Sequence, residues 1–306
     1  MASSWSPLPY IGNKNCISDL INAIMPPHEK YLEACAGSAE LLIRKKPAKI
    51  ELLNDYSGDV TNFWRVLQSN ENLVYLLGRI ALSINSELLF KQNRELLMRT
   101  PNILDDLKQT DYIIRHATKA QIEQAAAFFE NQVYSFSSTG QAFGIDIRDI
   151  VERVPRLTAT SARMRHVCVL HRDYKDAILY AAGDGTVIVI DPPYKGTEGM
   201  YPKGSFGASE HEVLFRFLFE EVHQRFGGKC KIIITYNDCP LIRSLAKECG
   251  FFTMTRDRKH NMRQRVEAGD MFSEFIITNF DMEKQAEENH QLHILETSQM
   301  DLFGGN

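Results

Sequence analysis

The chain has 306 residues, of which 44% are apolar and 24% are charged, and its formal net charge is −4 at pH 7. These proportions exclude disordered and fibrous classes of protein. No run approaches the ~20 apolar residues of a membrane span, and the first residues lack the apolar stretch of a signal peptide. We therefore expect a cytoplasmic protein that does not enter a membrane, with a catalytic core and one insertion.

Negative charge is concentrated at the C-terminus. Residues 281–306 contain six acidic residues against one lysine, so the rest of the chain is close to neutral. The overall charge therefore does not exclude a nucleic acid as partner. Whether the chain binds one depends on the charge of local surface patches.

Cysteine and histidine spacing gives no metal signal. The six cysteines form no close pairs, and the nine histidines include no HExxH pattern. We expect reduced thiols in the core and no structural or catalytic metal.

Short apolar runs alternate with helical patterns along both ends of the chain. Helices are expected at 14–25, 38–46, 57–68 and 209–225, and buried strands at 31–36, 50–54, 167–170, 187–190, 231–236 and 275–280. Continuous β-branched and apolar runs indicate strands covered on both faces. Strands alternating with helices predict an α/β fold with a mostly parallel sheet.

The pattern changes between about 67 and 160, where 71–98 and 103–129 look helical and no buried strand intervenes. We therefore expect a catalytic core at 1–66 and 157–282, an inserted, mainly helical subdomain at 67–156, and a flexible acidic tail at 283–306.

The sharpest chemical signal is Asp191-Pro192-Pro193-Tyr194, directly after an expected strand. In an open α/β sheet, ligands bind just beyond the carboxyl ends of strands. The prolines stiffen the turn, the carboxylate and the carbonyls of Asp191 and Pro192 accept hydrogen bonds, and Tyr194 offers an aromatic wall. This set suits an exocyclic amino group on a flat ring, although a proline turn with a capping aspartate is the structural alternative.

Two weaker signals precede it. Residues 33–39, Glu-Ala-Cys-Ala-Gly-Ser-Ala, form a small-residue turn after the first strand, where a ligand can approach the backbone, and Asp55 ends the next strand. An acid at that place can accept hydrogen bonds from ribose hydroxyls. The third signal is the segment Pro-Tyr-Ile-Gly-Asn-Lys at residues 9–14, which leads into the first expected helix. Taken singly, an ordinary strand–helix turn explains residues 33–39 equally well, and an N-terminal helix cap explains residues 9–14 better.

Together, the order and content of the three motifs resemble the Dam-type (DPPY) DNA adenine-N6 methyltransferases, which use S-adenosylmethionine. The resemblance runs from Pro9 to about Phe280 and includes a closing hairpin at Ser273–Asn279. It implies a Rossmann-like methyltransferase sheet whose insertion recognises the target. The implied catalytic residues are Asp191, Pro192, Pro193 and Tyr194, and the implied cofactor-binding residues are Tyr10, Lys14, Glu33, Gly37, Asp55, Asp173, Tyr174 and Asp191.

The chain departs from the family pattern at two positions of the glycine turn, where Cys35 replaces a phenylalanine and Ala39 replaces a glycine. The insertion also lacks the arginine- and asparagine-rich hairpin of the members that recognise GATC, so that specificity is not carried over. The resemblance implies a site-specific enzyme of the kind found in restriction–modification systems, in a bacterium or a phage.

The implied mechanism is direct transfer of a methyl group to an adenine base that has been flipped out of the duplex. The lone pair of an adenine amino group is delocalised into the ring, so acceptors from Asp191 and Pro192 would hold both N6 protons and favour a tetrahedral nitrogen. N6 is buried in a duplex, so the base must leave the stack, and Tyr194 is the expected stacking partner.

We expect double-stranded DNA to bind the basic run at 256–265, which we place between strands. Its expected DNA-binding residues are Arg258, Lys259, Arg263 and Arg265, and a solvated loop is the alternative.

Two other functions stay open: an RNA adenine methyltransferase, and an inactive DNA-binding module with the same fold. Methylation of a protein glutamine usually goes with an Asn-Pro-Pro-Tyr start, which Asp191 disfavours.

The tail suggests one partner. Residues 299–303, Gln-Met-Asp-Leu-Phe, resemble the peptides by which bacterial replication and repair proteins dock on the DNA sliding clamp. Gln299 would set the register, with Leu302 and Phe303 as apolar anchors. Folding of Leu302 and Phe303 back onto the core is the alternative.

Overall fold

The described part of this computed structural model comprises residues 6–101, 103–104, 117–145, 148–197, 206–207, 209–259 and 271–295, with the backbone alone at 257–259 and 271–272. It divides into two compact units. The first unit comprises Met1–Asn15, Ala36–Lys45 and Leu53–Arg172, and the second unit comprises Cys16–Cys35, Lys46–Leu52 and Asp173–Asn306. These units differ from the predicted core, insertion and tail, and that division stays a prediction.

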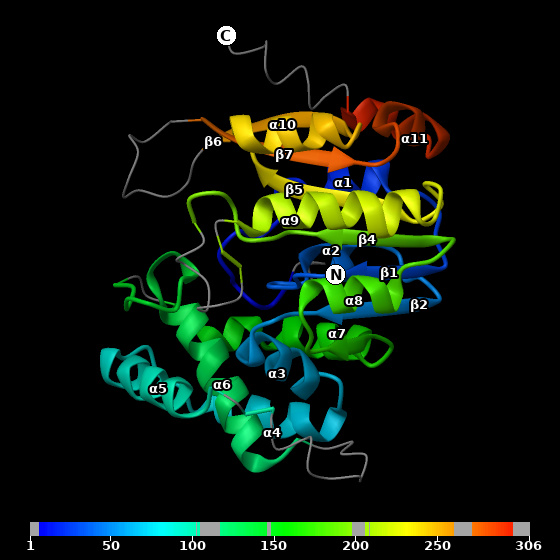
Figure 1. Cartoon of the computed structure of the whole chain (residues 1–306). Helices are drawn as coiled ribbons and strands as arrows, with labels where there is room; N and C mark the ends of the chain where they lie inside the picture. Colours follow the sequence, from blue (N-terminus) through cyan, green and yellow to red (C-terminus); the bar gives the residue numbers. More distant parts are fainter. Residues whose placement is uncertain are drawn as a thin grey trace. The chain divides into compact units, whose positions relative to one another are not determined.

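The strands form a mixed seven-stranded sheet in the order β3-β2-β1-β4-β5-β7-β6 (Figure 1). The predicted α/β class is confirmed, and all six expected strands are present. The strands are β1 (Lys30–Glu33), β2 (Ile50–Asn54), β3 (Cys168–Leu170), β4 (Thr186–Ile190), β5 (Lys231–Asn237), β6 (Phe252–Lys259) and β7 (Met271–Thr278).

Strand β6 corrects one prediction. Residues 256–259 of the basic run were expected between strands, but they belong to β6, which pairs antiparallel with β7. The residues of β6 are a mixture of polar, charged and apolar types. A strand at the edge of a sheet needs no continuous apolar run, so the sequence pattern did not predict this strand. The antiparallel pair confirms the closing hairpin that the family resemblance implied.

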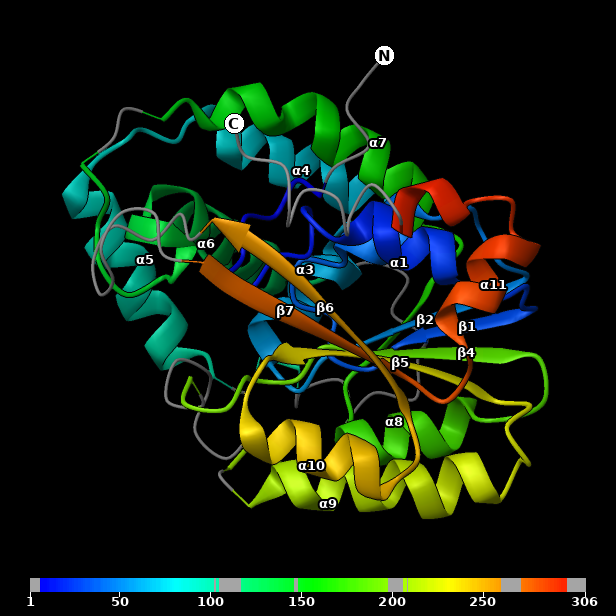
Figure 2. The same cartoon turned by 90° about the horizontal axis from the view of Figure 1, so that it is seen from above.

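In the second unit, strands β4 and β5 pair in parallel and β7 pairs antiparallel with β5. Three helices cover one face of these strands, and two others lie on the opposite face (Figure 2). The helices of the first face are α8 (Tyr174–Ala181), α9 (Glu210–Phe217, continued by the π-helix Leu218–Gln224) and α10 (Pro240–Glu248), and those of the second are α1 (Ser18–Ile24) and α11 (Met282–Glu288). Cover on both faces explains why every residue of β4 is buried.

Helix α11 lies where little regular structure was expected. Its N-cap Asp281 accepts a hydrogen bond from the backbone of Lys284, and Met282 and Ala286 are buried. The helix packs against α1, and Asn289 just beyond it donates to the carbonyl of Ala23 at 2.8 Å. The tail expected from residue 283 therefore begins with a packed helix.

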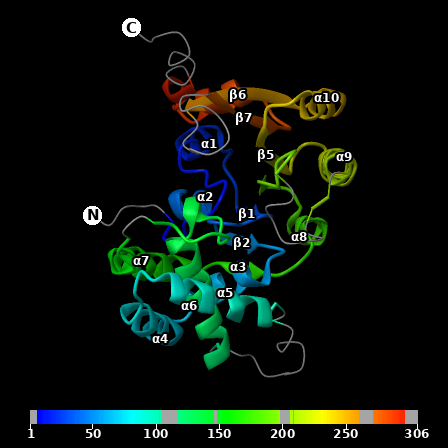
Figure 3. The same ribbon diagram turned by 90° about the vertical axis from the view of Figure 1, so that its left-hand side faces the viewer.

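In the first unit, α6 (Lys119–Tyr134) is the central helix and packs against three others (Figure 3). These neighbours are α3 (Gly58–Val66), α4 (Asn70–Ala81) and α5 (Glu87–Arg99), and the remaining helices of this unit are α2 (Glu40–Arg44), α7 (Val154–Met164) and the short 3-10 turns Phe136–Ser138 and Ile150–Arg153. The expected helix at 71–98 is two helices, because Ser83, Asn85 and Ser86 lie at the break and such side chains compete for backbone hydrogen bonds.

A buried carboxylate joins the helices α4, α5 and α6. Glu130 on α6 is fully buried and accepts from Arg79 of α4 at 3.0 Å and from Asn93 of α5 at 2.7 Å. Burial raises the pKa of Glu130, against the opposing effects of Arg79 and Asn93. Because losing a single partner would leave a buried charge poorly compensated, these hydrogen bonds tie α4 and α5 firmly to α6.

No helix among the described residues is long and apolar enough to cross a membrane.

Candidate active site

The end of β4 carries an acidic side chain that is held by the neighbouring strand. The strand runs directly into Asp191-Pro192-Pro193-Tyr194, of which the last three residues are buried. On the neighbouring strand β5, the hydroxyl of Thr235 donates to Oδ1 of Asp191 at 2.7 Å. The parallel pairing sets this hydrogen bond, because Ile190 and Ile234 are register partners and the two polar residues follow them. Thr235 is fully buried, so it holds the Asp191 carboxylate in one orientation.

Tyr194 is fixed by both its ring and its hydroxyl. The ring lies 5.7 Å from that of Tyr236, centroid to centroid, at 25° between the planes. The hydroxyl donates to Oε2 of the fully buried Glu274 on β7. Tyr236 is in turn bonded through its hydroxyl to Nδ1 of the buried His211, at 2.6 Å. Together, these interactions fix the orientation of the Tyr194 ring.

The backbone after Tyr194 is also pinned. The side chain of Asn237 accepts from the amide of Lys195 and donates to its carbonyl, both at 3.2 Å. The amide of Thr197 donates to the carbonyl of Tyr194 at 2.9 Å, which closes a turn through Gly196 at φ +90°. Positive φ favours glycine at that position.

In the first unit, the turn before α2 is built on Asp55. Oδ2 of Asp55 accepts from the amide of Gly37 at 2.9 Å, and Oδ1 accepts from the amide of Ser57 at 2.8 Å. The indole of Trp64 donates to the carbonyl of Gly37 at 3.0 Å. Burial raises the pKa of the Asp55 carboxyl, and the hydrogen bonds from Gly37 and Ser57 oppose that rise.

Tyr10 lies against this turn. A Cβ placed on Gly37, whose φ is +45°, would come within 3.1 Å of Cδ1 of Tyr10, closer than ordinary van der Waals contact. Lys14 is buried, and its ammonium donates to the carbonyl of Gly12. The structure therefore brings Tyr10, Gly37 and Asp55 together, as the sequence motifs suggested.

The other predicted cofactor residues lie in the second unit and already have structural partners. Glu33 is buried and accepts from the hydroxyl of Tyr31 at 2.9 Å. Asp173 is the N-cap of α8 and accepts from the amide of Lys175 at 2.9 Å.

Tyr174 is buried against the ring of Phe206, and its hydroxyl donates to Glu210 at 2.9 Å. Burial and then the bond to Glu210 raise the pKa of Tyr174 well above that of a free tyrosine, so this side chain stays a hydrogen-bond donor.

The predicted DNA-binding residues fall at the limit of the described residues. Arg258 and Lys259 close β6, where they pair in register with Phe272 and Met271. Arg263 and Arg265 lie outside the described residues, as do Gln299, Leu302 and Phe303 of the tail.

Sequence reasoning missed Thr235, Glu274 and Asn237. Thr235 and Glu274 are polar residues inside buried strands, and that is the signal that could have singled them out, since a buried polar group needs a partner. Within the described chain, no group of three or more histidine, cysteine or acidic side chains could hold a metal ion.

Comparison with known proteins gives a consistent result. Residues 10–262 match the model of the D12 class N6 adenine-specific DNA methyltransferases. The chain is also 26% identical, over 253 residues, to the DNA N-6-adenine-methyltransferase of Escherichia phage P1. That match covers 79% of this chain and 31% of the phage protein, so the chain spans about a third of the relative's length.

Replacing Tyr194 by phenylalanine should destabilise the protein by about 1–3 kcal/mol, since the buried Glu274 carboxylate loses a donor. Urea denaturation measures the change. Tyr75, which is 69% exposed, supplies the control Tyr75→Phe, expected to shift stability by less than about 0.5 kcal/mol. Equal stability of the two variants would show that the Tyr194–Glu274 bond contributes nothing.

Proposed function

Because the chain belongs to the D12 class of N6 adenine-specific DNA methyltransferases, we propose that it is a site-specific enzyme that methylates N6 of adenine in DNA. Membership in this family implies a methyl donor, and we propose S-adenosylmethionine. The observation that carries the proposal is the Asp191-Pro192-Pro193-Tyr194 sequence at the end of β4, with its carboxylate oriented by Thr235.

The task of this site is to improve a poor nucleophile. The carboxylate of Asp191 and the carbonyl of Pro192 accept hydrogen bonds from the two N6 protons, which favours a tetrahedral nitrogen with its lone pair exposed. A carboxylate has about four acceptor sites, more than the Thr235 hydroxyl fills. As the N6–methyl bond forms, the bond between the methyl group and the sulfur of the donor would break and N6 would release a proton to water, and no covalent bond to the protein is needed. Positioning and electrostatics supply the catalysis.

S-adenosylmethionine, when bound, supplies a methyl group on a positively charged sulfur that departs as a neutral thioether. The first unit supports a ligand of this kind: residues 36–39 are all small, Gly37 is half-buried, and the Asp55 carboxylate holds the amide of Gly37. We assign Tyr10, Lys14, Gly37 and Asp55 of this unit to the donor. The family resemblance also implies Glu33, Asp173, Tyr174 and Asp191, and we propose them as donor-binding residues as well.

Base flipping would bring the buried N6 out of the duplex to Asp191. We propose that Tyr194 stacks on the extruded adenine, with Tyr236 supporting its ring. Such stacking is worth about 1–3 kcal/mol per base.

Double-stranded DNA is the proposed substrate, held through its phosphates by the basic run and recognised by the insertion. The proposed phosphate-binding residues are Arg258, Lys259, Arg263 and Arg265. We further propose action in the cytoplasm of a bacterium or of a phage host, with the tail peptide at 299–303 as a docking site for a sliding clamp. The clamp is tested by comparing its retention on the intact chain and on a chain ending at Glu296, and equal retention by both would overturn it.

An RNA adenine methyltransferase is the alternative substrate class. Methyl incorporation into duplex DNA compared with ribosomal RNA distinguishes the two. A single-turnover assay with labelled donor distinguishes either enzyme from an inactive DNA-binding module.

Asp191→Ala should lower the rate of methyl transfer by about 100- to 1000-fold, because the amino group loses its charged acceptor. The measurement is N6-methyladenine formed in duplex DNA, counted by mass spectrometry after digestion. Asp184→Ala is the matched control, because Asp184 is an exposed aspartate paired with Lys229. Near-parental turnover of Asp191→Ala would refute the catalytic assignment.

Replacing Arg258, Lys259, Arg263 and Arg265 together by alanine should weaken DNA binding uniformly across sequences. The slope of log affinity against log salt should become shallower by about 0.9 for each phosphate that the variant no longer neutralises. Fluorescence anisotropy at several salt concentrations gives both slopes. Coincident slopes for variant and parent would identify the run as a solvated segment.

A further inference from the structure

The N-terminal segment, defined here as residues 6–15, contains no helix or strand, yet it carries Tyr10 and Lys14. Irregular backbone has no ladder of hydrogen bonds to hold it in place, so side chains of neighbouring elements must do so. In the first unit, Arg153 donates to the carbonyl of Pro7 at 3.1 Å, and further side-chain bonds come from α2, the short helix that follows the Gly37 turn.

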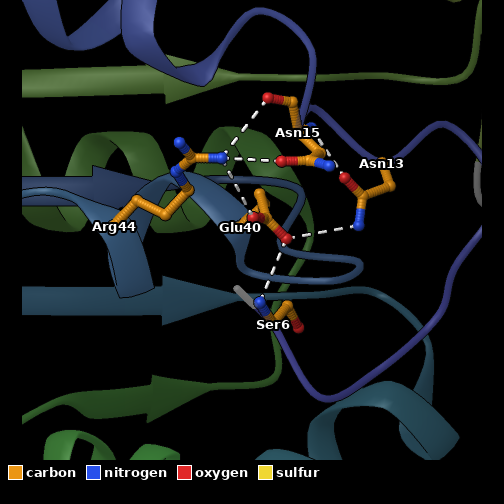
Figure 4. Close-up of polar contacts among 5 residues, drawn as sticks. All are labelled: Ser6, Asn13, Asn15, Glu40 and Arg44. Atoms are coloured by element: carbon orange, nitrogen blue, oxygen red, sulfur yellow. Dashed lines mark hydrogen bonds and ion pairs between the residues drawn. The ribbon is translucent and has the colours of Figure 1, made fainter. Parts of the chain in front are cut away.

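Two charged residues of α2 hold the two ends of this segment (Figure 4). Oε2 of Glu40 accepts from the amide of Ser6 at 3.2 Å and from the side-chain amide of Asn13 at 3.3 Å. Nη1 of Arg44 donates to Oδ1 of Asn15 at 2.6 Å and to its carbonyl at 3.4 Å. The segment is therefore held before and after Tyr10.

These hydrogen bonds also fix a distance. Glu40 begins α2 directly after the turn that contains Gly37, so one rigid piece of backbone carries both the turn and the residue that holds the segment. Tyr10 reaches back to this turn, with Cδ1 of its ring 3.1 Å from the place where a Cβ on Gly37 would lie. The separation between Tyr10 and the Gly37 backbone is thus set through Glu40.

Because the charge of Glu40 is buried, its stability depends on the position of the N-terminal segment. Glu40 is 3% exposed, and burial raises its pKa while Ser6, Asn13 and Arg44 oppose that rise. Nη1 of Arg44 lies 3.8 Å from Oε1 of Glu40, which is too far for a hydrogen bond. The hydrogen bonds that hold the Glu40 carboxylate are accepted at Oε2 and come from Ser6 and Asn13 of the segment. A buried carboxylate without such bonds is costly, so Glu40 is stable there only with the segment in place.

We propose that Glu40 is a positioning residue for the methyl-donor site, acting through the N-terminal segment to hold Tyr10 against the Gly37 turn. This proposal rests on the proposed function, since it takes the Gly37 turn and Tyr10 to bind the donor. It assigns no contact between Glu40 and the donor.

Isothermal titration with S-adenosylhomocysteine, the donor's product, tests the proposal on the full chain. Glu40→Ala should weaken binding about tenfold, which corresponds to about 1.4 kcal/mol and is the scale of a lost buried hydrogen bond. Hydrogen exchange of the amides at 6–15 should accelerate in the same variant. Asn93→Ala is the control, because it removes an equally buried hydrogen bond from the insertion helices of the same unit.

A conservative substitution separates positioning from general damage. In Glu40→Gln, the amide oxygen can take the place of Oε2 and accept from both Ser6 and Asn13, so affinity should stay close to the parental value. A loss in Glu40→Gln as large as that in Glu40→Ala would overturn the positioning role.

Each outcome decides a different claim. No binding of S-adenosylhomocysteine by the parent chain would overturn the proposed function and the proposal with it. Parental binding with unchanged affinity in Glu40→Ala, or an equal loss in Asn93→Ala, would overturn the positioning role alone. Selective loss in Glu40→Ala, with affinity retained in Glu40→Gln, would establish it.

Discussion

The register of two parallel strands is the constraint on which the candidate site depends. Because Ile190 pairs with Ile234, the chain leaves β4 at Asp191 just where β5 presents the hydroxyl of Thr235. A strand slipped by one residue would turn these side chains to the opposite face. Apolar packing on both faces of β4 and β5 therefore fixes the direction of a carboxylate through the pairing of the strands.

Buried polar groups in turn fix the position of Tyr194. Glu274 and His211 are both fully buried, and each bonds a tyrosine hydroxyl, on Tyr194 and Tyr236 respectively. Such a network costs free energy unless every member is satisfied, and in return it specifies one arrangement of the two stacked rings. The first unit uses the same device, since Asp55 and Glu40 each hold irregular backbone through amide hydrogen bonds. In both units, carboxylates define the shape of the segments that we assign to binding.

The sequence was sufficient to predict the α/β class, the strand before Asp191 and the motif itself, because local apolar runs and turn residues carry that information. It did not reveal Thr235 or Glu40, because their roles depend on partners 44 and 34 residues away along the chain. Edge strand β6 was missed because its residues do not form an apolar run, and α11 because its short apolar face is surrounded by acidic residues. Local sequence patterns predict helices and strands, whereas the residues that hold a site in place are defined by tertiary contacts.

Steady-state kinetics of Thr235→Val test the central claim most directly. Valine keeps the size and branching of the buried side chain but removes the hydrogen bond to Asp191. The account predicts that kcat for DNA methylation falls by about tenfold, the equivalent of about 1.4 kcal/mol, with KM for DNA and for the donor nearly unchanged. Thr186→Val, at the start of β4 and also buried, should leave kcat at the parental value. A parental kcat in Thr235→Val would contradict the claim that strand register orients the carboxylate that we propose to be catalytic.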